Sequence, residues 1–202
     1  MTKSAQTLFW EGEFGTEYAK RCDFDPAMRC NFWKKILELA NDAKSVCELG
    51  ANIGINLKAM NMLKSGLELY GVEANKTACD KMAQADYIKA IHTPIQEFTP
   101  DRKFNLVFTC GVLIHINPND LPEIYKKMYE WSDEYILINE YFNPKPVAIE
   151  YRGNTDRLFK RDFAAEFMEA NKGKVKLVDY GFLWNKAEPA WDNTTWFLMK
   201  KC

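Results

Sequence analysis

The sequence predicts an α/β protein in which helices cover both faces of a mostly parallel sheet. Seven apolar runs typical of strands occur along the chain, and the early ones alternate with segments whose apolar residues recur at helical spacing. Parallel strands need crossover connections, so this alternation favours a parallel sheet that is buried on both sides. With 202 residues, 47% of them hydrophobic, the chain is long enough for one buried core, and we expect a single globular domain.

The order of elements follows from local signals. Asp25 and Pro26 form a cap and a first-turn proline, which predicts a helix through Met28, Phe32, Ile36 and Ala40. No helical pattern separates the last two apolar runs, so we expect them to form an antiparallel hairpin at the sheet edge. The expected strands are 45–49, 69–73, 87–91, 104–110, 135–139, 175–180 and 194–199, and the further helices are 55–62, 77–83 and 119–131.

Composition excludes several classes of partner. The chain has 27 basic and 28 acidic residues, so its charge gives no bulk attraction to nucleic acid or to an anionic membrane. No apolar run reaches the roughly 18 residues of a membrane span, and the N-terminus lacks a signal-peptide core, which predicts a cytoplasmic protein. The six cysteines are dispersed and only two histidines occur, so we expect reduced thiols and no metal site. A small-molecule partner fits best.

The stretch "ELGANIG", residues 48–54, forms a glycine turn after the first strand. Ligands of such sheets bind at the carboxyl ends of the strands, where the chain order reverses. A dinucleotide motif needs its first and third glycines five residues apart, whereas Gly50 and Gly54 are four apart. A phosphate-binding P-loop needs lysine and a hydroxyl residue after its second glycine, and here Ile55 and Asn56 follow. Both phosphorylated ligands are therefore disfavoured.

Two acids at neighbouring strand ends indicate what the turn holds instead. Glu48 can accept hydrogen bonds from an ammonium group, and Glu73 ends the second strand, where it can accept from both hydroxyls of a ribose. An amino-acid-bearing nucleoside without phosphates has both groups. The pattern matches S-adenosylmethionine, and surface acids at strand ends are the alternative interpretation.

Three stretches, "VCELGANIG", "YGVEAN" and "FNLVFTCGVLIHINP", resemble the motifs of class I S-adenosylmethionine-dependent methyltransferases. Others, among them "FWEGEFGTEYAKR", "EYFNPKPVAIEYRG" and "WDNTTWFLMKK", resemble pseudaminic-acid-biosynthesis-associated methyltransferases, and this likeness runs from about residue 8 onward. The resemblance implies a Rossmann-like class I fold, with an N-terminal cap and first helix at 1–42 and a methyltransferase domain at 43–202. It also implies methyl transfer to an O or N nucleophile of a small polar acceptor, with a nonulosonic sugar or its activated derivative as the leading candidate.

The sequence departs from the family pattern at two places. The middle glycine of the first motif is Asn52, and "HTPIQEF" stands where many relatives place an aspartate on the adenine amine. Gln96 or the backbone near Ile95 would have to serve there. Tyr18 and Arg21 are candidates for the methionine carboxylate because related enzymes fold this segment over the cofactor. The expected cofactor-binding residues are Tyr18, Arg21, Glu48, Gly50, Ala51, Asn52, Gly54, Glu73, Ala74, Ile95, Gln96 and Cys110.

Catalytic candidates come from the segments after the fourth and fifth strands. His115 follows the fourth strand, where class I enzymes aim substrate at the methyl group, although a lone histidine after an apolar run is also typical of a structural residue. Glu140 and Tyr141 are the other candidate bases. The loop-rich stretch after them suits an anionic, polyhydroxylated substrate, or it is only a solvated connection. The expected substrate residues are Asn143, Tyr151, Arg152, Lys160 and Arg161, and Asp162 either joins them or caps the next helix.

Three rival functions stay open. One is methylation of another small amine or hydroxyl compound. Another is nucleic-acid methylation, which the balanced charge and the lack of a [DNS]-P-P-[YFW] motif after the fourth strand disfavour. The third is a non-catalytic protein that has kept the glycine turn. The sequence leaves the acceptor atom and the oligomeric state open.

Overall fold

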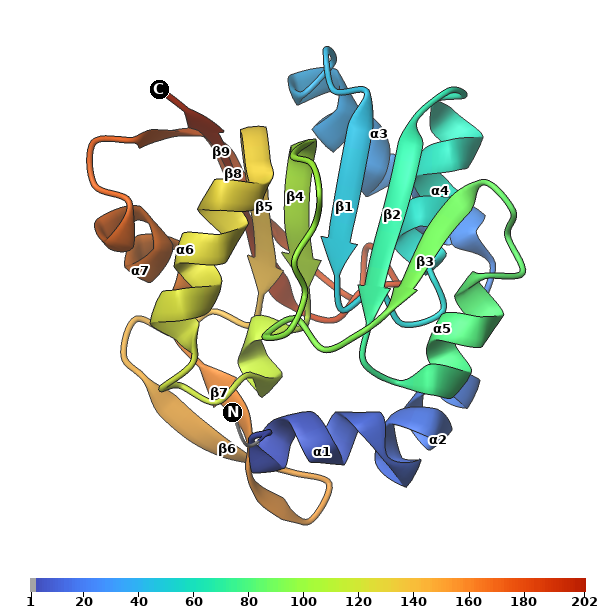
Figure 1. Ribbon diagram of the computed structural model, residues 1–202. Helices are drawn as coiled ribbons and strands as arrows, with labels where there is room; N and C mark the ends of the chain where they lie inside the picture. The colour runs from blue at the N-terminus through green and yellow to red at the C-terminus, as the bar shows by residue number, and fades with distance from the viewer. Residues whose placement is uncertain (1–2) are drawn as a thin grey trace.

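The predicted strands form one seven-stranded sheet in the order β3-β2-β1-β4-β5-β9-β8 in the computed structural model, which describes residues 3–202 (Figure 1). The first five strands are parallel, and β9 runs antiparallel between β5 and β8. This confirms the fold class and the terminal hairpin. The strands are β1 Ser45–Leu49, β2 Glu68–Glu73, β3 Ile88–His92, β4 Phe104–Cys110, β5 Ser132–Glu140, β8 Val175–Leu183 and β9 Thr194–Lys201.

The chain order reverses at β1. This strand pairs with β2 on one side and with β4 on the other, so the connections that leave the carboxyl ends of β1 and β4 diverge. A divergence of this kind opens a crevice at the carboxyl edge of the sheet. The glycine turn lies directly at that point, because it follows β1.

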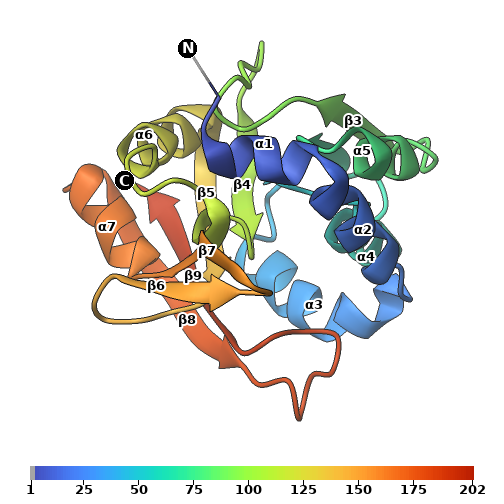
Figure 2. The same ribbon diagram turned by 90° about the horizontal axis from the view of Figure 1, so that it is seen from below.

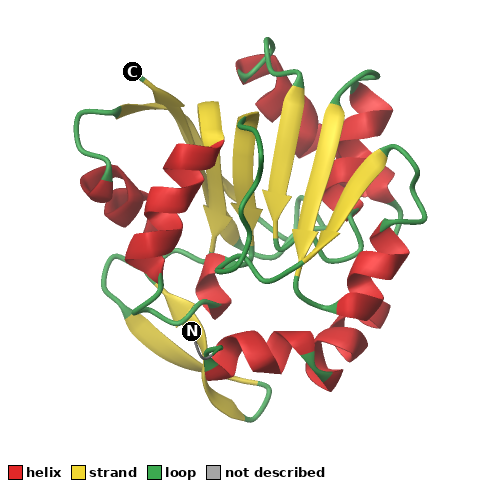
Figure 3. Ribbon diagram, viewed as in Figure 1, coloured by secondary structure: helices red, strands yellow, loops and turns green. Residues whose placement is uncertain are grey.

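Helices cover both faces of the sheet, as predicted (Figure 3). One face packs against α3 Cys30–Leu39, α4 Ile55–Leu63 and α5 Lys76–Met82, and the other against α6 Leu121–Trp131 and α7 Phe163–Ala170. The first predicted helix starts late, because Pro26–Arg29 forms a 3-10 turn that Asp25 caps through the Ala27 amide. Within residues 3–202, no helix combines the length and apolarity needed to cross a bilayer.

Two further units lie beyond the carboxyl edge (Figure 2). The helices α1 Ala5–Glu11 and α2 Glu13–Arg21 are joined at Gly12, and a separate two-stranded sheet is formed by β6 Val147–Tyr151 and β7 Asn154–Lys160. The sequence predicted a loop where this hairpin lies. Its turn residues Arg152 and Gly153 have φ of 50° and 77°, the left-handed pair of a tight type I′ turn, but the Asn-Gly signature of such turns is missing.

Candidate functional site

A cavity of about 350 Å³ lies at the carboxyl edge of the sheet. Its walls come from the glycine turn, the ends of β2 and β4, the 3-10 turn Leu113–His115, the helices α1 and α2, the β6–β7 hairpin and the loop before β9. The cavity therefore brings together segments from both ends of the chain. The sequence-predicted residues that line it are Tyr18, Glu48, Gly50, Ala51, Asn52, Glu73, Ala74, Ile95, Gln96, Cys110, His115, Tyr141, Tyr151 and Arg152.

The glycine turn needs its left-handed backbone. Gly50 has φ of 74°, and a Cβ there would lie 2.6 Å from Cγ2 of Val112, so no side chain fits. Asn52 has φ of 51°, and asparagine is among the residues that adopt this region most readily after glycine. The departure from the family's glycine thus preserves the conformation of the turn. Gly54 lies outside the cavity and lets the start of α4 approach Met82, whose Cγ would be 2.9 Å from an added Cβ.

Glu73 joins the glycine turn to the end of β2. Its Oε2 accepts a hydrogen bond from the Asn52 amide at 2.7 Å, and its Oε1 accepts one from the Asn75 amide at 2.7 Å. These backbone contacts hold the carboxylate at the cavity wall. Each carboxylate oxygen keeps a further lone pair, so a ligand with two neighbouring hydroxyls can still donate to Glu73.

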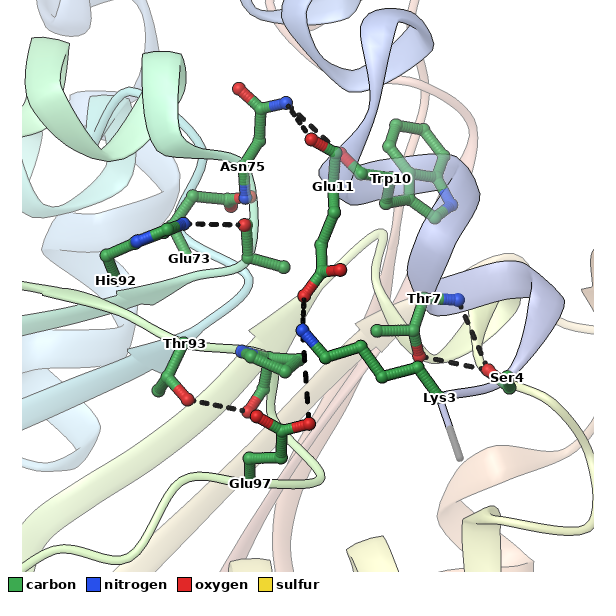
Figure 4. A network of polar contacts seen from close by, with 12 residues as sticks. Lys3, Ser4, Thr7, Trp10, Glu11, Glu73, Asn75, His92, Thr93 and Glu97 are labelled. Carbon is green, nitrogen blue, oxygen red and sulfur yellow. Dashed lines mark hydrogen bonds and ion pairs between the residues drawn. The ribbon is translucent and has the colours of Figure 1, made fainter. Parts of the chain in front are cut away.

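Asn75 connects this strand end to the N-terminal helices. Its Nδ2 lies within 3.2 Å of the backbone oxygens of Trp10, Glu11 and Gly12, and its Oδ1 accepts from the Ala78 amide and caps α5. Figure 4 shows the Asn75 amide pointing at the α1 chain beside Glu73. The cap over the cavity is therefore attached at the strand end that holds Glu73.

Glu48 and Asn56, which are buried, form a polar cluster with the half-buried Arg29. Glu48 Oε1 accepts from Asn56 Nδ2 at 2.5 Å, and Asn56 Oδ1 accepts from an Arg29 NH1 group at 2.7 Å. Within the described residues 3–202, Glu48 Oε2 and Arg29 Nε have no hydrogen-bond partner, and both residues line the cavity. Burial raises the pKa of Glu48 to about 8. An α-amino-acid group has an ammonium for Glu48 and a carboxylate for Arg29, so the cluster fits the methionine end of S-adenosylmethionine.

Arg21 does not take the place predicted for it. Its guanidinium is exposed and lies over the rings of Phe14 and Tyr18, at 5.8 and 5.7 Å from their centroids, outside the cavity wall. Arg29 comes from the turn before α3 and reaches the cavity instead. Tyr18 itself does line the cavity.

His115 lies in the cavity wall as a neutral side chain. Its Nδ1 is 2.6 Å from the carbonyl oxygen of Arg157, which can only accept, so Nδ1 carries the proton and Nε2 keeps a free lone pair. Burial lowers the pKa of His115 to about 4. The ring packs between Trp10 and Tyr151, with centroid distances of 4.4 and 5.2 Å. His115 can therefore accept a hydrogen bond from a ligand at neutral pH.

Glu140 is buried beneath the site and lines no part of the cavity. Its Oε1 accepts from the amides of Val112 and Leu113 at 3.0 and 3.1 Å, and its Oε2 accepts from the amide of Ile114 at 3.4 Å. Burial raises the pKa of Glu140 to about 7. This placement makes Glu140 a support for the turn that carries His115, in contrast to the predicted contact with substrate.

Tyr141 follows Glu140 on the chain and points to the cavity. Its hydroxyl donates to Asp192 Oδ2 at 2.7 Å, and both residues line the wall. Cys110 also lines the cavity, and burial raises the pKa of its thiol to about 12, so it is present as the neutral thiol.

The remaining predicted substrate residues lie outside the cavity wall. Asn143 donates through its side chain to the Lys145 carbonyl, Lys160 Nζ lies 5.1 Å from the centroid of the Tyr141 ring, and Arg161 is paired with Glu166 at 2.8 Å. Asp162 caps α7 through the Ala165 amide, which is the structural alternative for that residue. Of the basic residues predicted in this stretch, Arg152 alone reaches the cavity.

Several wall residues were not found from the sequence. Trp10, Arg29, Asn56 and Asp192 come from four separate segments, and none follows a predicted strand end closely enough to indicate its place. Two of these segments carry a signal: the aromatic "FWEGEFG" around Trp10, and "AEPAWDN", where an aromatic and an acid adjoin between two strands. Long-range packing alone brings these side chains together.

The comparisons with known proteins agree on the fold. No family model and no curated protein matches the chain. Among solved structures, the chain is similar to a magnesium protoporphyrin IX methyltransferase from Synechocystis PCC 6803 with bound S-adenosylhomocysteine (10% identity, TM-score 0.71, 96% of this chain and 97% of that chain). It is also similar to 1,6-didemethyltoxoflavin-N1-methyltransferase from Burkholderia thailandensis (15% identity, TM-score 0.73, 100% and 92%).

A third similar structure is the glycopeptide N-methyltransferase MtfA with S-adenosylhomocysteine (13% identity, TM-score 0.66, 94% of this chain and 97% of that chain). The coverage in all three cases spans nearly the whole of both chains. At these identities the likeness concerns the fold. The chain therefore has the Rossmann-like fold of class I S-adenosylmethionine-dependent methyltransferases.

Proposed function

We propose that this protein transfers a methyl group from S-adenosylmethionine to an O or N nucleophile of a small polar acceptor. The observation that carries the proposal is the pair of buried, unpartnered atoms at one end of the cavity, Glu48 Oε2 and Arg29 Nε, with Glu73 at the neighbouring strand end. An ammonium, a carboxylate and a ribose diol satisfy these three side chains together. The structural neighbours above, which were solved with S-adenosylhomocysteine, support the same cofactor.

The chain's residues have defined tasks in this reaction. Bound S-adenosylmethionine supplies an activated methyl group on a sulfonium. The protein has to bring the nucleophile into line with the methyl carbon and to limit access of water, which the position of the cavity between the sheet edge and the caps α1–α2 and β6–β7 favours. His115 Nε2 and the Tyr141–Asp192 pair are the acceptors that can orient the hydrogen atoms of the nucleophile.

The sequence resemblance suggests a nonulosonic sugar, or its nucleotide-activated or amidated form, as the leading acceptor. Arg152 at the tip of the β6–β7 turn is available to an anionic group of such a compound. Another small amine or hydroxyl compound is the alternative, and the cavity favours neither by its size alone.

Product analysis tests the proposal. The protein is incubated with S-adenosylmethionine that carries a labelled methyl group and with a panel of activated and free sugars, and the products are examined by mass spectrometry. We expect label in an acceptor and release of S-adenosylhomocysteine. Failure of both S-adenosylmethionine and S-adenosylhomocysteine to bind at millimolar concentration in calorimetry would contradict the proposal.

A further inference from the structure

The wall of the cavity divides into two sets of polar groups. Glu48, Asn56, Arg29 and Glu73 are matched by the cofactor under the proposed function, on which the following inference rests. Among the polar side chains left over are His115, Tyr141, Asp192 and Arg152, which come from the segments after β4 and β5, the loop before β9 and the hairpin.

Three of these remaining groups present acceptors to a ligand. His115 uses its ring proton on the Arg157 carbonyl, so Nε2 accepts. Tyr141 uses its only proton on Asp192, so its oxygen also accepts. The Asp192 carboxylate is exposed to the cavity and accepts through both oxygens. A ligand that satisfies these acceptors needs several hydrogen-bond donors. A neutral hydroxyl has one donor, whereas a protonated amine has two or three.

The charge and the aromatic surroundings favour the same ligand. Asp192 is the carboxylate of this set, and among the described residues that line the cavity Trp10 packs against Tyr18 and His115, and Tyr151 packs against His115. Ring faces and a carboxylate together attract a cation. Burial, with the nearby Asp192 charge as a smaller cause, raises the pKa of Tyr18 well above its usual value, so Tyr18 stays neutral beside the acid.

We infer that the methyl acceptor is an amine and that Asp192, held by Tyr141, binds its nitrogen in the cavity. The bound ammonium gives up one proton, which leaves through the exposed Asp192 carboxylate to solvent. The nitrogen lone pair then forms a bond to the methyl carbon, and the electron pair of the carbon–sulfur bond goes to sulfur. The products are the N-methylammonium compound, S-adenosylhomocysteine and the released proton, so atoms and charge balance.

The test does not require the acceptor to be known. Sinefungin carries a protonated amino group where S-adenosylmethionine carries the transferable methyl, so it places a cationic nitrogen toward Asp192. Calorimetry measures the dissociation constants of sinefungin and S-adenosylhomocysteine for the full chain, for Asp192→Asn and for Tyr141→Phe. Asp133→Asn, an exposed acid at the opposite end of β5, is the matched control.

We expect the full chain and the control to prefer sinefungin by about five- to tenfold, the size of one charge-assisted contact at a solvent-exposed carboxylate. Asp192→Asn should bind both compounds about equally, with unchanged affinity for S-adenosylhomocysteine. In Tyr141→Phe, the ratio of sinefungin affinity to S-adenosylhomocysteine affinity should fall to about half of its value in the full chain. A preference for sinefungin that Asp192→Asn retains would overturn the inference and leave the proposed function intact. No binding of either compound would overturn both, and any product labelled only on oxygen would overturn the amine acceptor.

Discussion

The cofactor side and the acceptor side of this cavity are built in different ways. On the cofactor side, Glu48 lies one residue before the end of β1 and Glu73 ends β2, and the backbone amides of Asn52 and Asn75 hold Glu73 in place. On the acceptor side, Trp10, His115, Tyr151 and Asp192 come from four segments that meet only in the folded protein. The sheet itself therefore fixes the first set, whereas the caps and the loop before β9 place the second.

The largest effect is expected at Glu73, the residue most firmly tied to the sheet. Glu73→Ala removes the acceptor of two backbone amides and the partner of the ribose, so S-adenosylhomocysteine affinity should fall by at least about 100-fold, the loss of two charge-assisted hydrogen bonds. Calorimetry measures the affinity, and circular dichroism confirms that the variant is folded. Glu68→Ala, at the other end of the same strand, should bind normally. If both variants lost the same amount of affinity, the loss would come from damage to the strand and would contradict a ribose contact of Glu73.

The next effect concerns the protonation of Glu48. Burial raises its pKa to about 8, so below that pH the unliganded protein holds the carboxyl group protonated. A cofactor ammonium favours the ionised form, so binding at pH 6.5 should release about one proton, and affinity should rise as pH rises toward 8. Calorimetry in two buffers of different ionisation enthalpy counts the protons.

Glu48→Gln keeps an oxygen for Asn56 but removes the charge. This variant should bind about 10-fold more weakly at pH 8, the size of one hydrogen bond to a charged group, and should release no proton. Proton release that persists in Glu48→Gln would assign it to another group and would remove Glu48 from contact with the ammonium.

A substitution on the acceptor side should have a smaller effect, and it should change turnover instead of cofactor affinity. His115→Ala should lower turnover about 10-fold through the loss of one oriented hydrogen bond, while S-adenosylhomocysteine affinity stays within about twofold. Because the pKa of His115 is lowered to about 4, its titration should produce no inflection in turnover between pH 6 and 9. An inflection in that range that His115→Ala abolishes would contradict the neutral role assigned to this ring. Turnover is measured with an acceptor found by product analysis.

The smallest effect is expected at Asn75, which connects the end of β2 to the N-terminal helices. Asn75→Ala removes the cap of α5 and the contacts to α1, which should cost about 1 kcal/mol in the free energy of unfolding. Hydrogen exchange in residues 5–21 should become faster, while the exchange of β1 stays slow. The exposed Asn119→Ala serves as control. Unchanged exchange in 5–21 would mean that ring packing holds the cap without Asn75.

The same division explains what the sequence could predict. The seven strands, the two acids and the glycine turn depend on neighbours in the chain, and the structure confirms the strands to within about three residues at each end. The acceptor side depends on residues such as Tyr141 and Asp192, which are joined by a hydrogen bond across 51 positions. No local pattern indicates such a pairing.

For two groups of residues, the local sequence pattern predicts a role that differs from the one in the structure. Glu140 was a candidate base because it ends β5, yet the strand's pleat directs its side chain to the amides of Val112 and Leu113. The basic stretch after β5 was interpreted as a loop, but Lys160 and Arg161 belong to the end of a hairpin and contact Tyr141 and Glu166. In both cases the side chain's direction, which the sequence does not encode locally, decided its role.

A crystal structure of the protein with S-adenosylhomocysteine tests most directly whether Glu48, Arg29 and Glu73 bind the cofactor. We expect the nucleoside in the cavity, with both ribose hydroxyls at about 2.7 Å from the Glu73 carboxylate, the usual hydrogen-bond length, and the amino-acid end between Glu48 and Arg29. An empty cavity at saturating ligand, or a nucleoside bound with its ribose turned away from Glu73, would contradict this expectation.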